Sequence, residues 1–313
     1  MPAPHSPTAR DARRRGRGAR SGGPRIWGLF ALPGTAWIAA FFAVPFYAVA
    51  SVAFGSTDPV FGEPVPEWNP LQWQFSTFGQ VWGSGFGGDL TPVLIRTGLY
   101  VLIAVLLCSL IGYPVAYYVA RLAGKRRGLL LGLILAPWWI NYLTRMMAWL
   151  NLLADDGWVN RLLRASGLIT GPVHWLSGNP YTVVIALVYG YIPFFIVPLF
   201  ATLDRIDGRL LEASRDLGMG AARTFLRVTL PLSRPGLLTA CVITALPMFG
   251  DYYTNTLVSG SPTTSMIGNQ IQLYLLGGPQ KDYGASLVLL LSALLTLLMA
   301  YYLHTVRRDG KEN

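Results

Sequence analysis

Six long apolar segments constrain this chain more than any other feature of its sequence. A helix needs about 20 apolar residues to cross the hydrocarbon of a bilayer, and each segment has about that length or more. Only 13% of the 313 residues are charged, whereas an average soluble domain carries about 25%. The pattern predicts an all-α polytopic membrane protein with six transmembrane helices in a lipid bilayer. The expected spans are residues 26–54, 97–119, 128–152, 181–203, 235–258 and 285–303.

The placement of the basic residues predicts how these helices are oriented. If the N-terminal tail lies in the cytoplasm, the segments on that side carry 20 of the 25 Lys and Arg residues, and the opposite loops carry only 3. The positive-inside rule then places both termini in the cytoplasm. The formal charge of +10 is spread over several short loops, so it does not predict a nucleic-acid-binding face.

Both ends of the chain fall outside the expected membrane domain at residues 26–306. Residues 1–25 are rich in Arg, Gly, Pro and Ser, a composition typical of a disordered tail, and residues 307–313 form a second cytoplasmic tail. A cleaved signal peptide is the alternative interpretation of the first apolar segment. A secretory core has about 7–15 residues, and the charge-free run is roughly twice as long, which favours an uncleaved helix.

The loop at residues 204–234, between the fourth and fifth spans, is long and amphipathic. Its apolar residues recur at helical spacing. Asp204 and Asp207 are candidate N-caps, because a carboxylate can accept hydrogen bonds from the first free backbone amides of a helix. Gly218 and Gly220 can end a first short helix by adopting the left-handed conformation. The sequence therefore predicts a short helix that stops near these glycines.

A second short helix is expected to follow in the same loop and to end at Pro231, with Pro235 opening the fifth span. Two interpretations fit such a pair of amphipathic helices. They can lie on the lipid surface, or they can present an apolar ridge to the groove of a partner protein.

The residues of this loop resemble the EAA loop of type I ABC importer permeases. That family has Glu-Ala-Ala, a Gly after three further residues, an aliphatic residue after nine more, and Leu-Pro after one more. The chain matches every spacing, with Ser in place of the second Ala and Val in place of the usual Ile. The matching residues are Glu212, Ala213, Ser214, Gly218, Val228, Leu230 and Pro231.

The resemblance implies that this loop is a coupling helix, seated in a cleft of a separate ABC ATPase subunit. Small residues would permit close approach, Gly218 would allow a bend, and Leu230-Pro231 would form a rigid corner that transmits movement to the fifth span. The chain has no phosphate-binding loop of its own, since Gly124-Lys125 is followed by Arg126. We therefore expect a permease subunit and not an enzyme, with no cofactor and with ATP bound by the partner.

Three other stretches resemble the spermidine/putrescine permease branch of this family and imply a polyamine cargo. They are Gly-Tyr-Pro-Val-Ala-Tyr at 112–117, Pro-Trp-Trp and Leu-Thr-Arg within 137–145, and Gly-Asp-Tyr-Tyr-Thr-Asn at 250–255 with Met-Ile-Gly-Asn at 266–269. Permeases for iron, thiamine or phosphonate share much of this pattern, so these cargoes stay open. The resemblance also implies a bacterial inner-membrane location, an extracytoplasmic substrate-binding protein, and a second permease chain that makes a heterodimer.

Asp251 is the only acidic residue within an expected span, and a charge at membrane depth needs a partner or water. Arg145 lies at a similar depth in the third span, which predicts a structural ion pair between the two. The alternative places Asp251 on the translocation path, where its carboxylate attracts a polyamine cation. Aromatic rings near it would offer their faces to ammonium groups. The candidates are Tyr252, Tyr253, Trp139 and Trp149.

Other classes of membrane protein fit the sequence less well. A secondary transporter needs charged residues for ion coupling and usually two related halves, but only Asp251 and Arg145 lie within the expected spans. An intramembrane enzyme needs paired catalytic groups at membrane depth, which the spans lack. Cys108 and Cys241 stand in separate apolar runs without metal-ligand spacing, so neither a disulfide nor a metal site is expected.

Overall fold

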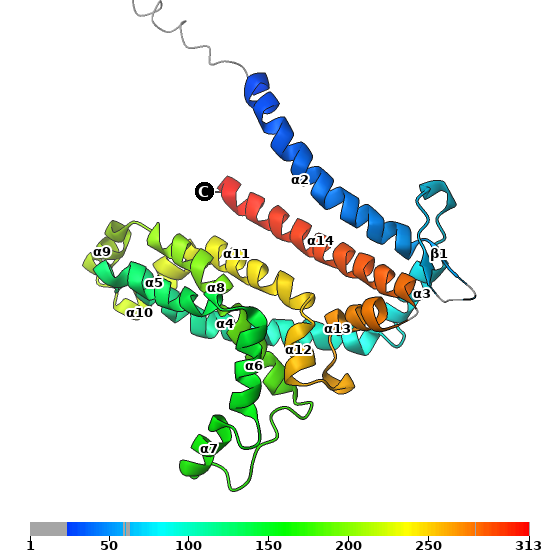
Figure 1. Cartoon of the computed structure of the whole chain (residues 1–313). Coiled ribbons are helices and arrows are strands. Elements are labelled where there is room, and N and C mark those ends of the chain that lie inside the picture. Colours follow the sequence, from blue (N-terminus) through cyan, green and yellow to red (C-terminus); the bar gives the residue numbers. More distant parts are fainter. Residues whose placement is uncertain (1–23, 59, 61–62, 279, 313) are drawn as a thin grey trace, which may run out of the picture. The chain divides into compact units, whose positions relative to one another are not determined.

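The computed structural model describes residues 24–58, 60, 63–278 and 280–312, and is helical almost throughout (Figure 1). The predicted disordered tail lies mostly outside the described residues. The chain divides into two compact units between Ala50 and Ser51. The first helix, α2 (Pro24–Ala53), is an apolar helix of 30 residues with two internal prolines, Pro33 and Pro45.

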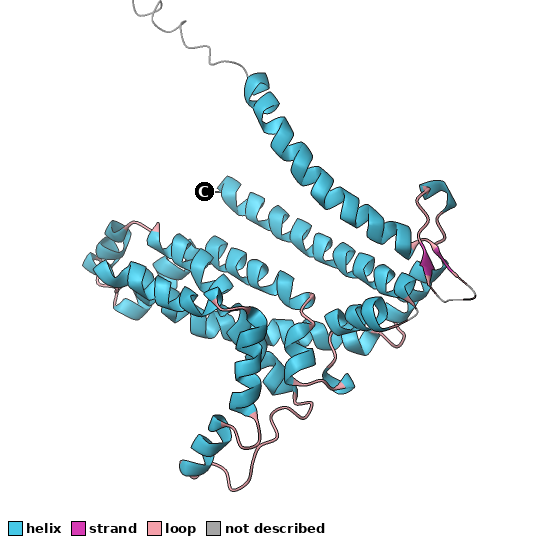
Figure 2. Cartoon of the chain, in the orientation of Figure 1, coloured by secondary structure: helices cyan, strands magenta, loops and turns pink. Residues whose placement is uncertain are grey.

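Within the described residues, 5 helices are long and apolar enough to cross a membrane. They correspond to the first, second, fourth, fifth and sixth predicted spans. They are α2, α4 (Thr91–Arg121), α8 (Pro180–Asp204), the continuous helix Ala221–Phe249 that contains α11 (Leu230–Phe249), and α14 (Lys281–Glu312). The two short strands β1 (Ser56–Thr57) and β2 (Pro64–Val65) pair antiparallel in the loop that follows α2 (Figure 2).

The third predicted span is not one continuous helix, and this expectation was wrong. It is divided into α5 (Arg127–Leu135), a 3-10 turn (Ala136–Trp139) and α6 (Tyr142–Leu153), and the two halves meet at an angle of 88°. The chain is extended at Ile140. Asn141 then caps α6 by accepting a hydrogen bond of 2.9 Å from the Leu143 amide, which fixes a new helix start. Six crossings are reached only if this bent pair counts as one.

The fifth span also differs from its prediction, because its helix begins before Pro231 and continues through it. Residues Ala221–Thr224 (α10), the π-helical turn Phe225–Thr229 and α11 form one helix. In this turn the Leu230 amide donates to the Phe225 carbonyl, five residues back. A proline has no N–H and clashes with the carbonyl four residues back in a regular α-helix. The wider π-turn is the adjustment that lets this helix continue.

The main core of the second unit lies between α4, α8 and α11. Gly112 on α4 allows close approach, since a Cβ there would lie 2.7 Å from Cδ1 of Phe195 on α8. In lipid such packing rests on shape and van der Waals contact, because the surrounding tails are as apolar as the side chains. The buried core residues include Val101, Ala104, Cys108, Val183, Leu187, Leu199, Ala240 and Met248.

A second core cluster joins α14 to α3 (Ser76–Gly85) and α13 (Ile267–Gln272). It contains Val81, Ile267, Leu287 and Leu290. The remaining elements are short: the 3-10 turns Pro70–Gln72, Gly124–Arg126 and Pro262–Thr264, the helices α7 (Trp158–Ala165), α9 (Gly208–Asp216) and α12 (Tyr253–Val258), and a second π-helical turn, Leu273–Gly277.

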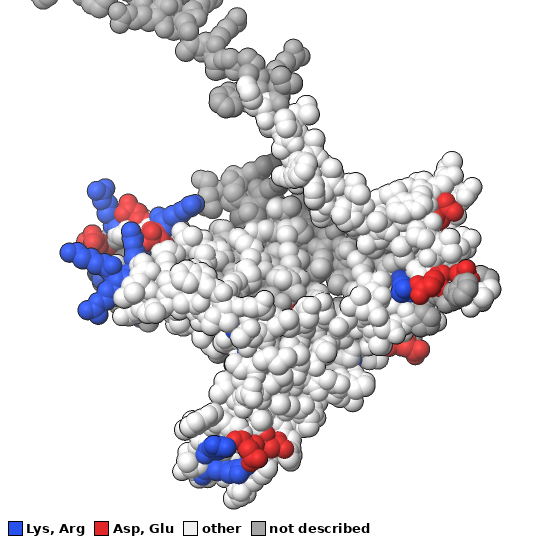
Figure 3. Space-filling view, viewed as in Figure 1, with Lys and Arg blue, Asp and Glu red and all other residues white. Residues whose placement is uncertain are grey.

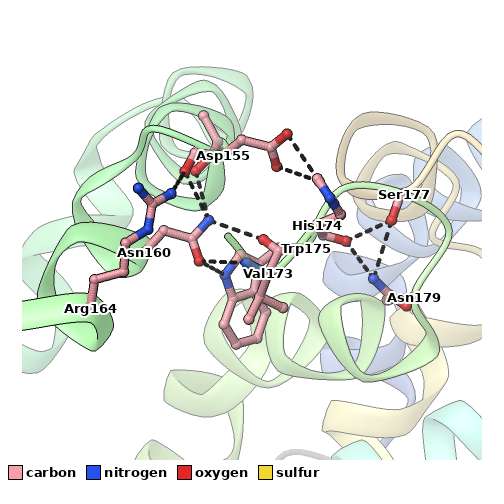
Figure 4. A network of polar contacts seen from close by, with 9 residues as sticks. Asp155, Asn160, Arg164, Val173, His174, Trp175, Ser177 and Asn179 are labelled. Carbon is pink, nitrogen blue, oxygen red and sulfur yellow. Dashed lines mark hydrogen bonds and ion pairs between the residues drawn. The ribbon is translucent and has the colours of Figure 1, made fainter. Parts of the chain in front are cut away.

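The connection between α6 and α8 is organised by Asn160 of α7 (Figure 4). Its side chain is fully buried. Its Nδ2 donates to the carbonyls of Ala154, Asp155 and Val173, and its Oδ1 accepts from the Val173 amide and from Nε1 of Trp175, all within 3.0–3.2 Å. One amide side chain thus replaces the regular backbone pairing that this irregular segment lacks.

Charged side chains concentrate at the ends of the second unit. Lys and Arg gather around α9, α10 and the turn Gly124–Arg126, Asp and Glu prevail near β1 and α3, and both signs are mixed around α7 on the face in view (Figure 3).

Candidate functional site

The loop predicted to be a coupling element forms the short helix α9 and the first part, α10, of the long helix that continues into α11, at the basic end of the second unit. Asp207 caps α9, because its carboxylate accepts a hydrogen bond of 3.0 Å from the Arg209 amide. Asp204 is the last residue of α8, so the prediction that it caps α9 was wrong. Gly218 has a φ of +79°, as expected of a left-handed helix end. Gly220 has a φ of −68°, so its predicted left-handed conformation was wrong.

A buried hydroxyl pair holds α9 against α10. Oγ of Ser214 lies 3.0 Å from Oγ1 of Thr224, and both residues are buried. The family pattern has Ala at the position of Ser214. A hydroxyl in place of a methyl group therefore adds a specific bond at the contact between the two helices. The spacing of the motif gave no signal for Thr224.

The motif residues divide into an exposed and a half-buried group. Glu212, Ala213 and Gly218 are exposed on α9 and at its end, whereas Val228, Leu230 and Pro231 are half-buried beside the membrane helices. Arg121 Nη2 donates a hydrogen bond of 2.6 Å to the Ile206 carbonyl. Arg127 pairs with Asp204 at 3.1 Å. The first contact thus attaches the segment before α9 to α4, and the second attaches the end of α8 to α5.

Asp251 lies in the break between α11 and α12 and is 7% exposed. Tyr191 on α8 donates a hydrogen bond of 3.0 Å to its Oδ2, and Tyr142 on α6 donates to the same oxygen at 3.3 Å. The Thr254 amide donates to Oδ1 at 3.0 Å, and the Thr254 hydroxyl also donates to Oδ2. Hydrogen bonds to the charged form offset the cost of burying a carboxylate.

The predicted ion pair between Asp251 and Arg145 was wrong. No nitrogen of Arg145 lies within 4.0 Å of the Asp251 carboxylate in the described structure. Instead, Cζ of Arg145 lies 5.5 Å from the ring centroid of Trp138 and 5.4 Å from that of Tyr142. Tyr142 therefore contacts both charges, since its ring faces the guanidinium and its hydroxyl binds the carboxylate.

Arg145 is also short of hydrogen-bond partners. It is 8% exposed, and its Nε and Nη1 atoms have no partner among the described residues. A buried guanidinium without acceptors is unfavourable. The two cation–π contacts offset part of that cost.

Asp251 and Arg145 line the same pocket, which has a volume of about 550 Å³. Of the aromatic residues predicted from sequence, Tyr252 and Tyr253 line it, with ring centroids 4.1 Å apart. Trp139 and Trp149 do not. Trp139 is exposed, and Trp149 packs on Tyr189. The pocket also contains aromatic residues that sequence reasoning missed: Trp138, Tyr142, Tyr191 and Phe194.

The backbone around Asp251 is held by the segment that leads into α13. A Cβ on Gly268 would lie 2.8 Å from the Gly250 carbonyl oxygen and 2.9 Å from the Asp251 carbonyl carbon, so only glycine fits. Asn269 donates a hydrogen bond of 3.0 Å to the Tyr252 carbonyl. Arg96 on α4 donates to the Ser265 carbonyl at 2.8 Å and anchors the same segment.

The described residues contain no group of three or more His, Cys, Asp or Glu that could hold a metal ion. Cys108 and Cys241 are both free thiols within the spans. The chemistry that this part of the chain offers is therefore one buried carboxylate, one guanidinium and a set of aromatic and hydroxyl groups.

Three features define a class, the membrane permease subunit of a transporter: membrane-crossing helices, a basic end that carries α9 and α10, and a pocket lined by the buried charges of Asp251 and Arg145. Residues 109–308 match the family described as the binding-protein-dependent transport system inner membrane component. The chain belongs to this family, whose members are transport subunits. It is thus the permease subunit of a type I ABC importer, a multi-pass inner-membrane protein that works with ATPase and substrate-binding partners.

Curated relatives agree with this assignment. The chain is 35% identical over 220 residues to the spermidine/putrescine transport system permease protein PotB of Escherichia coli, covering 70% of this chain and 79% of that protein. It is 36% identical over 200 residues to PotB of Haemophilus influenzae, covering 64% and 69%. The predicted resemblance to the polyamine branch is confirmed.

Two solved transporters share the fold at low identity. A chain of a bacterial alginate ABC transporter, in complex with its periplasmic protein, aligns with a TM-score of 0.71 and 18% identity over 92% of this chain and 96% of that one. A chain of the MetNI methionine ABC transporter aligns with a TM-score of 0.54 and 20% identity over 70% and 95%.

Proposed function

We propose that this chain forms half of the translocation path for a polyamine of the spermidine/putrescine type, driven by a separate ATPase. The observation that carries the proposal is the buried Asp251 carboxylate in an aromatic pocket. The 35% identity to PotB supports the same cargo. Asp251 lies between three helices that belong to different parts of the chain, and such a position suits a group on the path.

The donors around Asp251 suggest how an ammonium group would bind. Tyr142 and Tyr191 donate neutral hydrogen bonds to Oδ2, and a cationic donor forms a stronger bond with a carboxylate than a hydroxyl does. An arriving ammonium group can therefore displace one tyrosine hydroxyl without leaving the carboxylate unpaired. Tyr252 and Tyr253 line the same pocket and offer ring faces to the cation.

The α9–α10 segment is proposed as the site where the ATPase docks. Glu212 and Ala213 are exposed on α9, and Leu217 at its end is 80% exposed. Ser214, Gly218, Val228, Leu230 and Pro231 would shape and support this surface. An ATPase cleft that receives α9 would cover these apolar groups and give Glu212 a basic partner.

The rest of the assembly follows from the proposed path. A chain of this size cannot enclose a gated path alone, so a second permease chain, in a heterodimer, would supply the other half. Two ATPase subunits would bind beneath, on the side of both termini, which we place in the cytoplasm. A binding protein would deliver the cargo at the opposite side. Residues 26–306 would form the membrane domain and 204–234 its coupling loop.

A second candidate cargo is an oxyanion such as a phosphonate, and the specific observation in its favour is Arg145. Its Nε and Nη1 atoms have no partner among the described residues, and the residue lines the pocket with Asp251. A phosphonate oxygen would satisfy such a guanidinium through charge-assisted hydrogen bonds.

Reconstitution separates the two cargoes. The chain is co-expressed with the second permease, the ATPase and the binding protein encoded with it, and uptake of labelled putrescine into proteoliposomes is measured with competitors. We expect ATP-dependent putrescine uptake that excess spermidine inhibits and excess phosphonate does not. Absence of putrescine uptake together with uptake of phosphonate would replace the polyamine proposal with the anion one.

A further inference from the structure

Phe225 begins the π-helical turn after α10 and packs between two tyrosines of α4. Its ring centroid lies 5.5 Å from that of Tyr113 at an interplanar angle of 85°, and 5.7 Å from that of Tyr117 at 89°. Both contacts are edge-to-face, an arrangement that favours one orientation of the rings because the positive ring edge meets the negative face. The two tyrosines therefore fix the orientation of the Phe225 ring as well as its position.

A buried hydrogen bond joins the same two helices on the other side of the turn. Ser233 Oγ donates to the Leu230 carbonyl at 3.1 Å. The Ser233 hydroxyl has one proton, which it donates in this bond. In the 2.6 Å contact between the two hydroxyl groups, the Tyr113 hydroxyl is therefore the donor and Ser233 Oγ the acceptor. Tyr113 and Ser233 are both buried. Tyr113 thus contacts the long helix at two points: its ring packs on Phe225, and its hydroxyl forms a hydrogen bond with Ser233.

These contacts lie on either side of an irregular part of the helix that leads from the coupling segment into the membrane. Between Phe225 and Ser233 lie the π-turn, with its i→i+5 hydrogen bond, and Pro231, which donates none. The hydroxyl pair Ser214–Thr224 is directly adjacent on the side of α9. A push on α9 would thus reach Phe225 first and the membrane part of α11 only through the bracketed turn.

We propose that Tyr113, Tyr117, Phe225 and Ser233 form a tyrosine clamp that makes α4 the fulcrum for movement of the coupling segment. With the clamp closed, α10, the π-turn and α11 move as one lever against α4. With the clamp open, the π-turn and Pro231 bend and absorb the displacement before it reaches Asp251. This proposal rests on the proposed docking of the ATPase at α9–α10.

The test uses the complete importer in proteoliposomes and measures cargo uptake and ATP hydrolysis on the same preparation. Tyr113→Phe removes one oxygen atom and keeps the ring, so it tests the Ser233 bond without disturbing the packing. Phe225→Leu keeps an apolar side chain and removes both ring contacts. Tyr118→Phe on the same helix is the control, since Tyr118 is exposed and outside the clamp.

We expect the assembled complex to keep its ATP hydrolysis while cargo imported per ATP falls about fivefold in Tyr113→Phe, the change that loss of one net hydrogen bond predicts. Phe225→Leu is expected to lower the ratio further and Tyr118→Phe to leave it unchanged. Ser233→Ala removes the same bond from its other end, together with the bond to the Leu230 carbonyl. The double variant with Tyr113→Phe should therefore lose no more than Ser233→Ala alone.

An unchanged ratio of uptake to ATP hydrolysis in Tyr113→Phe and Ser233→Ala would overturn the clamp. So would a parallel fall of uptake and hydrolysis with the amount of assembled complex, because that is the signature of a purely structural contact. If either result is obtained while the remaining complexes retain the ATPase, the docking proposal is unaffected. Loss of the ATPase on substitution of Glu212 or Gly218 bears on docking alone.

Discussion

The hydroxyl of Tyr191, on α8, donates a hydrogen bond of 3.0 Å to Oδ2 of Asp251, in the break that follows α11. The helix that ends at this break is continuous for 29 residues, from Ala221 to Phe249, a length of about 43 Å at 1.5 Å per residue. Its other end belongs to the proposed coupling segment. One continuous helix therefore joins the candidate cargo site to the candidate docking site.

Asp251→Asn tests the carboxylate as the cargo-binding group. The substitution keeps the size of the side chain and one acceptor oxygen but removes the charge. Hydrogen bonds to charged groups contribute about 1.5–3 kcal/mol, so we expect uptake at low cargo concentration to fall by about 10- to 100-fold. The yield of assembled complex should stay unchanged. Asp89→Asn, an exposed acid in the turn between α3 and α4, is the matched control. Normal uptake by Asp251→Asn would remove this residue from the path.

Gly268→Ala tests whether the position of the Asp251 backbone matters. The new Cβ would lie 2.8 Å from the Gly250 carbonyl oxygen, so the backbone must shift at a cost of about 1–3 kcal/mol. We expect a lower melting temperature of the purified complex and reduced uptake. At Gly277 the nearest atom to a new Cβ lies 3.8 Å away, and Gly277→Ala should leave both quantities near wild type. Equal effects at the two glycines would contradict the structure.

Gly218→Ala tests the bend after α9. Gly218 has a φ of +79°, and no atom lies within 4 Å of a Cβ placed there, so the substitution acts through backbone strain of about 1–2 kcal/mol. We expect less ATPase to co-purify with the chain. Gly220 is equally open but has a φ of −68°, and Gly220→Ala should retain the ATPase. Undiminished retention by Gly218→Ala would show that the bend is not needed for docking.

Asn160→Ala tests whether the hydrogen bonds of the Asn160 side chain hold the connection between α6 and α8 together. The variant leaves the Val173 amide and the Trp175 indole N–H without their acceptor, at a cost of about 3 kcal/mol. Limited proteolysis of the intact complex should then cut residues 154–179 faster. Asn151→Ala is the control, because Asn151 is exposed and donates to a single carbonyl, that of Met147. Equal cleavage rates would mean that Asn160 does not hold this segment.

Sequence patterns predicted the membrane helices well and their interruptions poorly. Apolar length fixes whether a helix can cross a bilayer, and α4, α8 and α14 satisfy it directly. The break in the third span depends on the Asn141 cap and on the extended Ile140, which follows the 3-10 turn that contains Pro137. The apolar length of this segment dominated the prediction, so these two local signals were not used. Likewise, Pro231 signals a helix end in sequence, but the π-turn before it compensates for the missing hydrogen bond.

The candidate site was predicted in part. Asp251 and Arg145 were identifiable as rare charges in apolar segments, and both line one pocket. The predicted ion pair between them was wrong, because hydroxyl groups donate the hydrogen bonds that the Asp251 carboxylate accepts. Tyr142 lies three residues before Arg145, a spacing that places both on one helix face, although the sequence gave no reason to link it with Asp251. Tyr191 stands in an apolar run without any pattern, and only the tertiary fold brings it to the carboxylate.

The most direct test of the account is photo-crosslinking from the end of α9 in living cells. Leu217, which is 80% exposed, is replaced by the photo-reactive residue p-benzoylphenylalanine, and Trp158 on α7, 71% exposed, is replaced in a control. We predict an adduct between the chain and the ATPase subunit from position 217 and none from position 158. Adducts with lipid alone from position 217, in cells that contain the ATPase, would contradict it.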